Sequence, residues 1–435
     1  MFIPSMYILY SLLLGCAALI SLPWWLLQMA RLGKYRAGFR QRMGAVPPWL
    51  QPAGNEGCIW IHAVSVGEVL AISRLVGELS RQYPEKRIFV STTTATGQAL
   101  AQQRFGEGRV FYMPLDFHFA LRPYLTTLRP GVLILAETEF WPNLLHLAGK
   151  RGAAVAVVNA RISDRSFPRY RRLRWFFSRV ISNVDLFLAQ TEEDARRLKE
   201  IGAPEECIAV SGNLKFDIRL SAGSPLTASL HTAIAADSPV IVCGSTAEGE
   251  EEQVITAFRQ VLHQFPKTIM ILAPRHPERF EKVSELIASS GLKLTRRSAW
   301  QPEAPLPPGS IFLLDSVGEL ASVYELANVA FVGGSLVPLG GHNILEPAQH
   351  GVPVLTGPHT FNFREIVRIF EQGGGLRVVT AENFGAVLIE LLGSASERDI
   401  LGRRAHELFA QNTGATEKTM AALQPLLTGK TAVAK

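Results

Sequence analysis

Glu68 is the residue whose type and position point most directly to chemistry. It follows a glycine in the run Ile61-His62-Ala63-Val64-Ser65-Val66-Gly67-Glu68, directly after the apolar stretch Cys58-Ile59-Trp60. In an open parallel sheet, ligands collect outside the carboxyl ends of the strands, so an acid placed there can act as a base or bind a ligand. A helix cap is the alternative, because the helix dipole favours Asp and Glu in the first turn.

Several glycine-rich segments in the second half of the chain suit a phosphate. Gly333-Gly334-Ser335 ends an expected strand, and Gly340-Gly341-His342-Asn343 leads into a helix expected to begin near Ile344-Leu345-Glu346. Backbone N–H groups and a helix N-terminus are therefore predicted to bind a phosphate, and Glu346 to accept hydrogen bonds from ribose hydroxyls. The alternative is that these glycines only make tight turns.

Arg275 is a further candidate for an anionic ligand. It lies in Pro274-Arg275-His276-Pro277-Glu278-Arg279, after an expected strand, where its guanidinium can pair bidentately with a phosphate. Gly244-Ser245-Thr246 follows the preceding expected strand and adds two hydroxyl groups. The alternative for Arg275 is an ordinary surface salt bridge.

Metal binding is not expected. Glu137-Thr138-Glu139 is an acid-x-acid motif of the kind that binds Mg²⁺ or Mn²⁺ in some sugar transferases, but no further oxygen ligands accompany it. The histidines show no HExxH-type spacing, so no structural metal site is predicted. The four cysteines, Cys16, Cys58, Cys207 and Cys243, form no paired spacing and predict neither a disulfide framework nor a zinc site.

The elements that position these residues have an α/β pattern. Short apolar runs alternate with longer amphipathic stretches, which is typical of βαβ units and a parallel sheet. A chain of 435 residues with 47% hydrophobic content suits two domains. Strands are expected at 59–62, 88–91, 133–136, 154–158 and 186–189 in the first domain, and at 240–243, 270–273, 311–314, 330–332 and 353–355 in the second.

Domain boundaries follow from composition. Residues 1–30 are expected to form an N-terminal membrane anchor and 31–220 the first Rossmann-like domain. The segment 221–238, rich in Ser, Ala, Thr and Pro, is expected to be a linker. Residues 239–402 are expected to form the second domain, and helices within 403–428 to pack back on the first.

The N-terminal segment predicts attachment to a membrane. No charged side chain occurs from Phe2 to Ala30, and Trp24 and Trp25 suit an interfacial belt. The absence of a basic region before the apolar run and of an A-x-A cleavage pattern after it favours an anchor over a cleaved signal peptide. The basic residues that follow predict an N-out, C-in orientation, although Pro23 leaves a helix lying on the membrane open. They are Arg31, Lys34, Arg36, Arg40 and Arg42.

Charge adds one further candidate surface. The net charge of +6 is a mild basic bias that suits an anionic surface or ligand and does not indicate nucleic acid. One segment interleaves arginines with aromatic residues and is predicted to meet anionic lipid. The alternative is a solvated helix with a buried aromatic stripe. Its members are Arg161, Arg165, Arg169, Arg171, Arg172, Arg174 and Arg179, with Phe167, Tyr170, Trp175, Phe176 and Phe177.

Six motifs together resemble one family. They are Val64-Ser65-Val66-Gly67-Glu68, Glu137-Thr138-Glu139-Phe140-Trp141-Pro142-Asn143, Asn159-Ala160-Arg161, Gly212-Asn213-Leu214-Lys215-Phe216-Asp217, Pro274-Arg275-His276-Pro277-Glu278-Arg279 and Gly340-Gly341-His342-Asn343. In this order they resemble the 3-deoxy-D-manno-octulosonic acid (Kdo) transferases, glycosyltransferase family 30, of bacterial lipopolysaccharide synthesis. The resemblance covers nearly the whole chain.

This resemblance implies a GT-B fold, with two Rossmann-like domains facing a cleft. The C-terminal domain would hold the donor CMP-Kdo and the N-terminal domain a lipid acceptor. The implied reaction is an inverting transfer of Kdo to the 6'-hydroxyl of the tetraacylated lipid A precursor, lipid IVA, on the cytoplasmic face of the inner membrane. It uses no metal or other cofactor and no nucleic-acid partner.

The resemblance also implies roles for individual residues. Glu68 would be the general base, and Glu137 and Lys215 would help to stabilise the transition state. Val317 and Ile344 depart from residues common in the family, which are methionine and proline respectively. The donor site would comprise Pro274, Arg275, Val317, Gly318, Glu319, Asn343, Ile344, Leu345 and Glu346.

Two other function classes are weighed against a transferase. A nucleotide-sugar epimerase shares the double-Rossmann architecture but acts on soluble sugars and needs no anchor. A catalytically inert membrane-associated binding protein has no use for both an acid and an anion site. The number of Kdo units added does not follow from the motifs.

Overall fold

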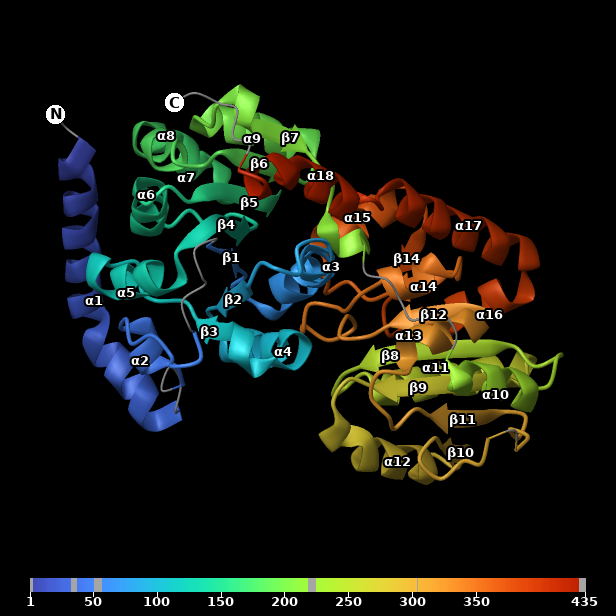
Figure 1. Ribbon diagram of the computed structural model, residues 1–435. Coiled ribbons are helices and arrows are strands. Elements are labelled where there is room, and N and C mark those ends of the chain that lie inside the picture. Colours follow the sequence, from blue (N-terminus) through green and yellow to red (C-terminus); the bar gives the residue numbers. More distant parts are fainter. Residues whose placement is uncertain (1–2, 33–36, 51–56, 218–223, 303, 430–435) are drawn as a thin grey trace. The chain divides into compact units, whose positions relative to one another are not determined.

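The computed structural model describes residues 3–32, 37–50, 57–217, 224–302 and 304–429 (Figure 1). The chain divides into two compact units, which we describe separately. Unit 1 comprises Met1–Ile218 with Thr413–Lys435, and unit 2 comprises Arg219–Asn412. Lys34 and Arg36 of the basic flank, and the tail after Gly429, lie outside the described residues.

Unit 1 is built on a seven-stranded sheet in the order β3-β2-β1-β4-β5-β6-β7, whose strand pairs are all parallel. The order reverses direction between β1 and β4, which makes this pair the topological switch point. The strands are β1 (Cys58–His62), β2 (Ile88–Thr92), β3 (Val110–Tyr112), β4 (Pro130–Ala136), β5 (Ala154–Ala160), β6 (Leu186–Ala189) and β7 (Ile208–Val210).

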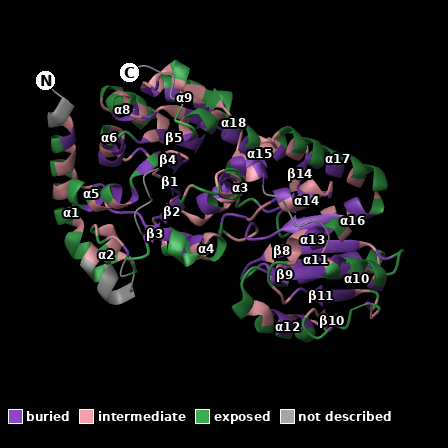
Figure 2. Cartoon of the chain, in the orientation of Figure 1, coloured by how far each residue is buried: buried purple, intermediate pink, exposed green. Residues whose placement is uncertain are grey.

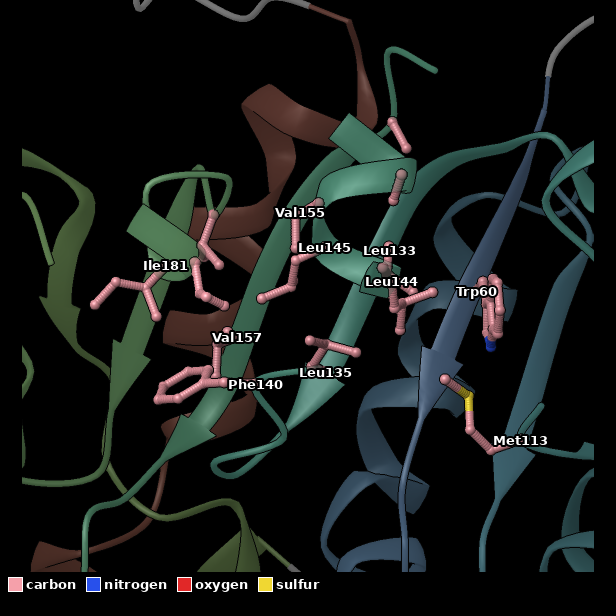
Figure 3. Packing of buried hydrophobic residues seen from close by; sticks show 14 of the residues in the cluster. Trp60, Met113, Leu133, Leu135, Phe140, Leu144, Leu145, Val155, Val157 and Ile181 are labelled. Carbon is pink, nitrogen blue, oxygen red and sulfur yellow. The ribbon is translucent and has the colours of Figure 1, made fainter. Parts of the chain in front are cut away.

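Helices cover both faces of this sheet. Residues of α5, α6, α8 and α9 pack with one set of strand side chains in a first hydrophobic cluster, part of which appears in Figure 3. Residues of α3, α4 and α18 pack with the opposite set in a second cluster. Because both faces are covered, the strands are apolar runs without polar alternation. The helices of unit 1 are α1 (Ile3–Leu32), α2 (Phe39–Arg42), α3 (Val66–Gln82), α4 (Ala95–Phe105), α5 (His118–Leu128), α6 (Pro142–Lys150), α7 (Phe167–Arg172), α8 (Arg174–Ile181), α9 (Glu192–Ile201) and α18 (Ala415–Leu427), with 3-10 turns η1 (Glu107–Arg109), η2 (Glu205–Cys207) and η3 (Leu214–Asp217).

Unit 2 repeats the architecture with a second seven-stranded parallel sheet, in the order β10-β11-β9-β8-β12-β13-β14. Its switch point lies between β8 and β12. The strands are β8 (Val240–Thr246), β9 (Ile269–Pro274), β10 (Lys293–Arg296), β11 (Ser310–Leu313), β12 (Val329–Val332), β13 (Val354–Thr356) and β14 (Leu376–Val378). The helices are α10 (Pro225–Ala233), α11 (Glu251–Gln264), α12 (Phe280–Ser289), α13 (Leu320–Val323), α14 (Leu345–Gln349), α15 (Arg364–Gln372), α16 (Phe384–Gly393) and α17 (Ala395–Gln411), with 3-10 turns η4 (Pro277–Arg279) and η5 (Tyr324–Leu326).

The sequence missed four strands, and these are the four edges of the two sheets. β3, β7, β10 and β14 are only three or four residues long, and each has a sheet neighbour on one side only. An edge strand need not be apolar on both faces, so β10 and β7 carry polar or partly exposed residues. The ten expected strands all occur, with ends that differ by a few residues.

Two segments differ from the expected domain plan. Within 221–238, expected to be a linker, residues 225–233 form α10, which begins at the Ser224 cap and buries Leu226 and Leu230 in unit 2. Of the C-terminal helices expected to return to the first domain, α17 belongs to unit 2, where it contacts α14 and α16. Only α18 joins unit 1, against α3, β4 and β5.

Asp217 holds the start of α18 in unit 1. Its carboxylate accepts hydrogen bonds from the backbone N–H groups of Gly414, at 2.7 Å, and Thr416. The guanidinium of Arg74 on α3 lies 3.8 Å from the same carboxylate. The side chain of the last residue of η3 therefore fastens a helix almost 200 residues later to unit 1, since the N–H groups of a first helical turn lack partners within their helix.

Glu250 plays the corresponding part at the switch point of unit 2. Its fully buried carboxylate accepts hydrogen bonds from the N–H groups of Ala247, Gly334, Ser335 and Leu336, at 2.6 to 2.9 Å. Ala247 follows β8, whereas the other three residues follow β12. One carboxylate therefore closes the loops on the two sides of the switch point.

We expect Glu250→Gln to destabilise unit 2 by at least about 2 kcal/mol, because a buried amide left without its acceptor costs about 1–3 kcal/mol. The melting temperature should fall, and the amide protons of residues 334–336 should exchange faster. The exposed Glu248, which pairs with Lys282, provides the control Glu248→Gln, with little expected effect. A Glu250→Gln variant that melts and exchanges like the wild type would contradict this role.

Candidate active site

The catalytic candidates of unit 1 lie at its switch point. β1 and β4 are neighbours in register, so the loops that follow them leave the sheet side by side. The first loop leads to Glu68 in the first turn of α3, and the second begins at Glu137. The third candidate, Lys215, lies on η3, which contacts α3.

Glu68 is held by its own loop. One carboxylate oxygen accepts a hydrogen bond from the Val64 N–H at 2.8 Å, and the other accepts one from the Ser65 hydroxyl at 2.9 Å. The side chain thus closes the turn between β1 and α3 in the manner of a capping residue. Both oxygens retain further acceptor capacity, and the residue is 8% exposed.

The surroundings of Glu68 disfavour its charged form. Burial raises its pKa to about 7, and the carboxylates of Glu137 and Glu139 add to the rise. The hydrogen bonds from Val64 and Ser65 oppose it. A carboxyl group that changes protonation state near pH 7 suits proton transfer, because an efficient base has a pKa close to the working pH.

Glu137 and Lys215 form an ion pair. Nζ of Lys215 lies 3.3 Å from Oε1 of Glu137, and both side chains are partly exposed. Glu137 has a left-handed backbone conformation, with φ of 60°, and its N–H donates to the Val158 carbonyl at 2.9 Å. A non-glycine residue with positive φ costs free energy, so the sheet edge must stabilise this turn. The structure therefore brings all three catalytic candidates into unit 1, two of them in direct contact.

Asn159 positions Lys215 and was given no separate role from the sequence. It is fully buried at the end of β5 with φ of 55°, and its side-chain oxygen accepts from the Leu214 N–H at 3.0 Å. Lys215 itself donates its N–H to the Asn213 side chain at 2.9 Å. The signal that could have identified Asn159 is its type, because asparagine tolerates the left-handed region.

His62 is a second residue that the sequence did not single out. It ends β1, is fully buried, and its Nδ1 lies 2.9 Å from the Ser91 hydroxyl and 3.1 Å from the Ser91 carbonyl oxygen. Burial lowers its pKa to about 4, so the imidazole is neutral near pH 7. A histidine inside an otherwise apolar strand was the available signal.

Glu139 and Glu137, the two acids of the acid-x-acid motif, have different surroundings. Burial raises the pKa of Glu139 to about 7, with a further contribution from Glu137, whereas Glu137 faces Lys215. In the part of the chain that the structure describes, no three His, Cys, Asp or Glu side chains are grouped to hold a metal ion.

The donor candidates of unit 2 follow strands at the carboxyl edge of its sheet. Arg275 follows β9 and is exposed, and its charge acts on both Glu346 and His342. Burial and the nearby Arg275 and His276 lower the pKa of His342 to about 4. Glu346 accepts a hydrogen bond from the Asn343 amide at 3.3 Å. The carboxyl edge of this sheet therefore brings five polar side chains near one another: Arg275, His276, His342, Asn343 and Glu346.

Several N–H groups of the glycine loops that the sequence predicted to bind a phosphate already have partners within the protein. The N–H groups of Gly334 and Ser335 already donate to Glu250, and that of Gly341 donates to the Gly334 carbonyl at 2.7 Å. α14 is only five residues long, and its Leu345 N–H donates to the Asn343 side chain at 3.2 Å. The carboxylate of Glu250 thus takes the hydrogen bonds that the N–H groups of Gly334 and Ser335 could have donated to a phosphate.

The remaining donor candidates differ in what they can offer a ligand. Val317 is 77% exposed, and Gly318 has φ of 91° in the same turn. Glu319 is engaged with Arg297, at 3.2 Å, and with the Ser316 hydroxyl. Pro274, Ile344 and Leu345 have buried side chains and can contribute only main-chain groups or packing.

The arginine-rich segment forms α7 and α8. Its aromatic residues Phe167, Tyr170 and Phe176 pack against the first hydrophobic cluster of unit 1, as the buried-stripe alternative expected. Leu173 and Trp175 are exposed, by 44% and 59%. Within the described residues, the exposed arginines at 165, 169, 171, 172 and 174 form no salt bridge, so the segment presents positive charge beside apolar groups.

Comparison with known proteins identifies the family. Residues 37–218 match the family described as 3-deoxy-D-manno-octulosonic-acid transferase (kdotransferase). A 3-deoxy-D-manno-octulosonic acid transferase of Haemophilus influenzae is 36% identical over 96% of this chain and 97% of its own length. The chain belongs to the Kdo transferase family. A Bordetella pertussis member is also 36% identical, over 93% of this chain and 92% of its own.

Comparison with solved structures concerns the architecture. A UDP-GlcNAc 2-epimerase from Neisseria meningitidis superposes with a TM-score of 0.53 at 12% identity, covering 84% of this chain and 99% of that chain. At this identity the likeness concerns the fold alone. The predicted GT-B class is confirmed, and so is the assignment as a glycosyltransferase that transfers Kdo in lipopolysaccharide synthesis.

We expect the pKa of Glu68 to fall when Glu137 is replaced by Gln. The substitution removes a negative neighbour and releases the positive charge of Lys215, and both changes favour the carboxylate. Carbon-13 NMR of labelled glutamate carboxyls, assigned with Glu68→Gln, measures the titration. Glu192→Gln, at the exposed start of α9, should leave the wild-type midpoint near 7. An unchanged midpoint in Glu137→Gln would contradict the coupling.

Proposed function

We propose that this Kdo transferase moves Kdo from CMP-Kdo to the 6'-hydroxyl of lipid IVA with inversion, and releases CMP. The observation that carries the proposal is the Glu68 carboxyl at the switch point of unit 1, with a pKa raised to about 7. Inverting transfer needs one base on the acceptor side and no covalent sugar intermediate. The family membership supports the sugar and the class of reaction.

Glu68 acts as the base in this proposal. Its carboxylate takes the proton from the acceptor hydroxyl while the hydroxyl oxygen attacks the anomeric carbon of Kdo. The bond between that carbon and the phosphate oxygen of CMP breaks, and CMP leaves with the electron pair. The hydrogen bonds from Val64 and Ser65 fix the carboxylate in place, so it needs little reorganisation for the transfer.

Lys215 supplies positive charge at the same switch point. In the free protein it is paired with Glu137 at 3.3 Å. An ammonium group can share its three hydrogens, so it can bind an anionic oxygen of the substrates without leaving Glu137. Glu137 in turn keeps the lysine in position, and this is how both residues stabilise the charge that develops during transfer.

Unit 2 binds the CMP part of the donor in this proposal. The exposed guanidinium of Arg275 suits the phosphate, and Glu346 with Asn343 suits hydroxyl groups of the ribose. Val317 is exposed and offers apolar contact to the base. We propose that basic residues replace a metal, and that no cofactor takes part.

The lipid acceptor places the protein at the inner membrane, on its cytoplasmic side. Within the described residues, one helix is long and apolar enough to cross a membrane, with the stretch Met6–Trp25 at its centre. The exposed arginines of α7 and α8 suit the phosphates of the acceptor or of anionic lipid. Attachment brings the enzyme to a substrate that does not leave the bilayer.

We expect Glu68→Gln and Glu68→Ala to lower kcat for Kdo transfer by about 10²-fold or more while CMP still binds. Product mass spectrometry with CMP-Kdo and purified lipid IVA measures transfer and counts the Kdo units. In the wild type, kcat/KM should rise as pH rises through about 7, because only the ionised carboxyl accepts a proton.

The matched control is Glu192→Gln, which removes an exposed first-turn acid from α9 and should retain wild-type turnover. Near-normal transfer by Glu68→Gln would leave Glu68 the role of a helix cap. Transfer to a soluble acceptor alone, or epimerisation of a nucleotide sugar, would exclude the proposed acceptor.

We expect Arg275→Met to weaken CMP binding by roughly 10- to 100-fold, because a charge-assisted hydrogen bond to phosphate contributes about 1.5–3 kcal/mol. Isothermal titration of CMP into the full-length protein measures the change. The exposed Arg368 on α15, which pairs with Glu365 of its own helix, gives the control Arg368→Met. An unchanged CMP affinity in Arg275→Met would remove this residue from the donor site.

A further inference from the structure

We propose that α1 lies in one leaflet of the membrane, fastened to unit 1 by its first turns (Tyr7 to Ser11), and does not cross the bilayer. The inference rests on the proposed membrane location and replaces the N-out orientation expected from the charge pattern. The partner of the exposed face of α1 is the hydrocarbon and headgroup region of a single phospholipid leaflet. Three observations carry it: polar contacts on the inner face of α1, apolar exposure on its outer face, and the elements to which the inner face is fastened.

The inner face of α1 makes specific polar contacts with unit 1. The Tyr7 ring stacks on His146 of α6 with centroids 3.9 Å apart, and its hydroxyl accepts a hydrogen bond from the Asn183 amide at 3.1 Å. One turn later, the Ser11 hydroxyl accepts a hydrogen bond from the Asn143 amide at 3.0 Å. Tyr10 lies between these residues on the same face, against the Asp116 carboxylate.

The receiving site is buried and already organised. Asp116 and Asn143 are 2% and 0% exposed. Asp116 accepts hydrogen bonds from the N–H groups of Asn143 and Leu144 at the start of α6, at 3.1 and 2.8 Å. Asn143 Nδ2 also donates to the Asp116 carbonyl at 2.5 Å. Ser11 and Tyr10 therefore add to a network that fixes the start of α6, and leaving it would expose buried polar groups without partners.

The described part of α1 is largely exposed or half-buried, green and pink in Figure 2, and its exposed residues are apolar. Exposure reaches 61% at Leu12, 70% at Leu19 and 81% at Ile20. A continuous apolar face of this length is unsuited to water and marks contact with a membrane or partner. The members of this face are Ile8, Leu9, Leu12, Leu13, Leu19, Ile20, Leu22, Trp24 and Leu27.

A transmembrane span conflicts with the inner contacts. Tyr7 and Trp25 are separated by about 27 Å along a straight helix, close to the thickness of the hydrocarbon core. If Trp25 lay at the cytoplasmic interface, Tyr7 would lie near the outer one and would carry α6 and α8 with it. The folded unit around α8, with the exposed charges of Arg174 and Arg179, would then have to enter the bilayer, where one arginine costs up to about 2.5–3.5 kcal/mol at the centre. A helix lying in one leaflet keeps α6 and α8 out of the bilayer and leaves the charges of Arg174 and Arg179 in water or among headgroups.

The neighbouring surface favours a phospholipid leaflet over another protein. Phe176 of α8 packs against Tyr10 of α1, with ring centroids 6.2 Å apart. The same helix exposes Trp175, and the adjoining α7 exposes Arg169, Arg171 and Arg172. An apolar helix beside an exposed tryptophan and exposed arginines that form no salt bridge with any described residue matches a leaflet interior bordered by phosphate headgroups.

The first experiment measures on which side the N-terminus lies. Ser5→Cys is introduced in a full-length Cys16→Ser/Cys207→Ser background and exposed to a membrane-impermeant maleimide in spheroplasts and in inverted inner-membrane vesicles. Glu192→Cys, on the exposed start of α9, marks the side of the catalytic units. We expect both cysteines to react only in inverted vesicles. Reaction of Ser5→Cys in intact spheroplasts would overturn the proposal.

The second experiment tests whether α1 stays fastened to unit 1. Its result decides the question in the case that Ser5→Cys reacts in neither preparation. Ser11→Cys/Asn143→Cys should form a disulfide in native membranes on mild oxidation, because the two native side chains are in hydrogen-bond contact. Leu12→Cys/Asn143→Cys is the control, since Leu12 points away with 61% exposure, and it should not cross-link. The cross-linked enzyme should remain in the membrane fraction and retain transfer. Cross-linking that releases it, or no cross-linking in a variant that still transfers Kdo, would refute the docked arrangement.

These outcomes are separate from failure of the proposed function. A wild-type protein recovered only in the soluble fraction would contradict the membrane location itself. Loss of Kdo transfer with correct sidedness and cross-linking would contradict the proposed reaction and leave the arrangement of α1 intact.

Discussion

The structure depends on how each parallel sheet is closed at its switch point. There, the loops after two neighbouring strands diverge, and their backbone N–H groups have no partner in a strand ladder. In unit 2, Glu250 satisfies four such groups from both loops with one buried carboxylate. In unit 1, Glu68 stands at the corresponding place after the first strand, but its hydrogen bonds come from its own loop.

This difference separates a structural acid, Glu250, from a candidate base, Glu68. Glu250 is fully buried with its oxygens engaged by four amides, so it has little capacity for a substrate. Glu68 accepts one hydrogen bond on each oxygen and has two acidic neighbours that disfavour its charge. The same topology thus produces a loop closed by a buried acid in unit 2 and a carboxyl group with a raised pKa in unit 1. Lys215, positioned through Asn159, balances the negative charge that Glu137 adds beside Glu68.

α1 contacts the same segment of unit 1 that carries Glu137. The side of the sheet that carries α6 and α8 also receives α1, through Asn143 in the motif that begins at Glu137. A motif that resembles the family's active-site sequence therefore serves two purposes along its length. Glu137 pairs with Lys215, whereas Asn143, six residues later, donates a hydrogen bond to Ser11 of α1.

The sequence alone determined the α/β class, the ten inner strands, a helix with Glu68 in its first turn and, through its motifs, the family. These features are local, because an apolar run, a glycine or a first-turn acid carries its own signal. The sequence did not predict the edge strands β3, β7, β10 and β14, because a strand with a neighbour on one side only need not be apolar throughout. α10 and α17 were misplaced because packing, and not composition, decides which unit buries them. Only the tertiary structure showed that Glu250 occupies the glycine loop, that Lys215 meets Glu137, and that Ser11 reaches Asn143, because each joins residues 78 to 132 positions apart whose pairing no local pattern encodes.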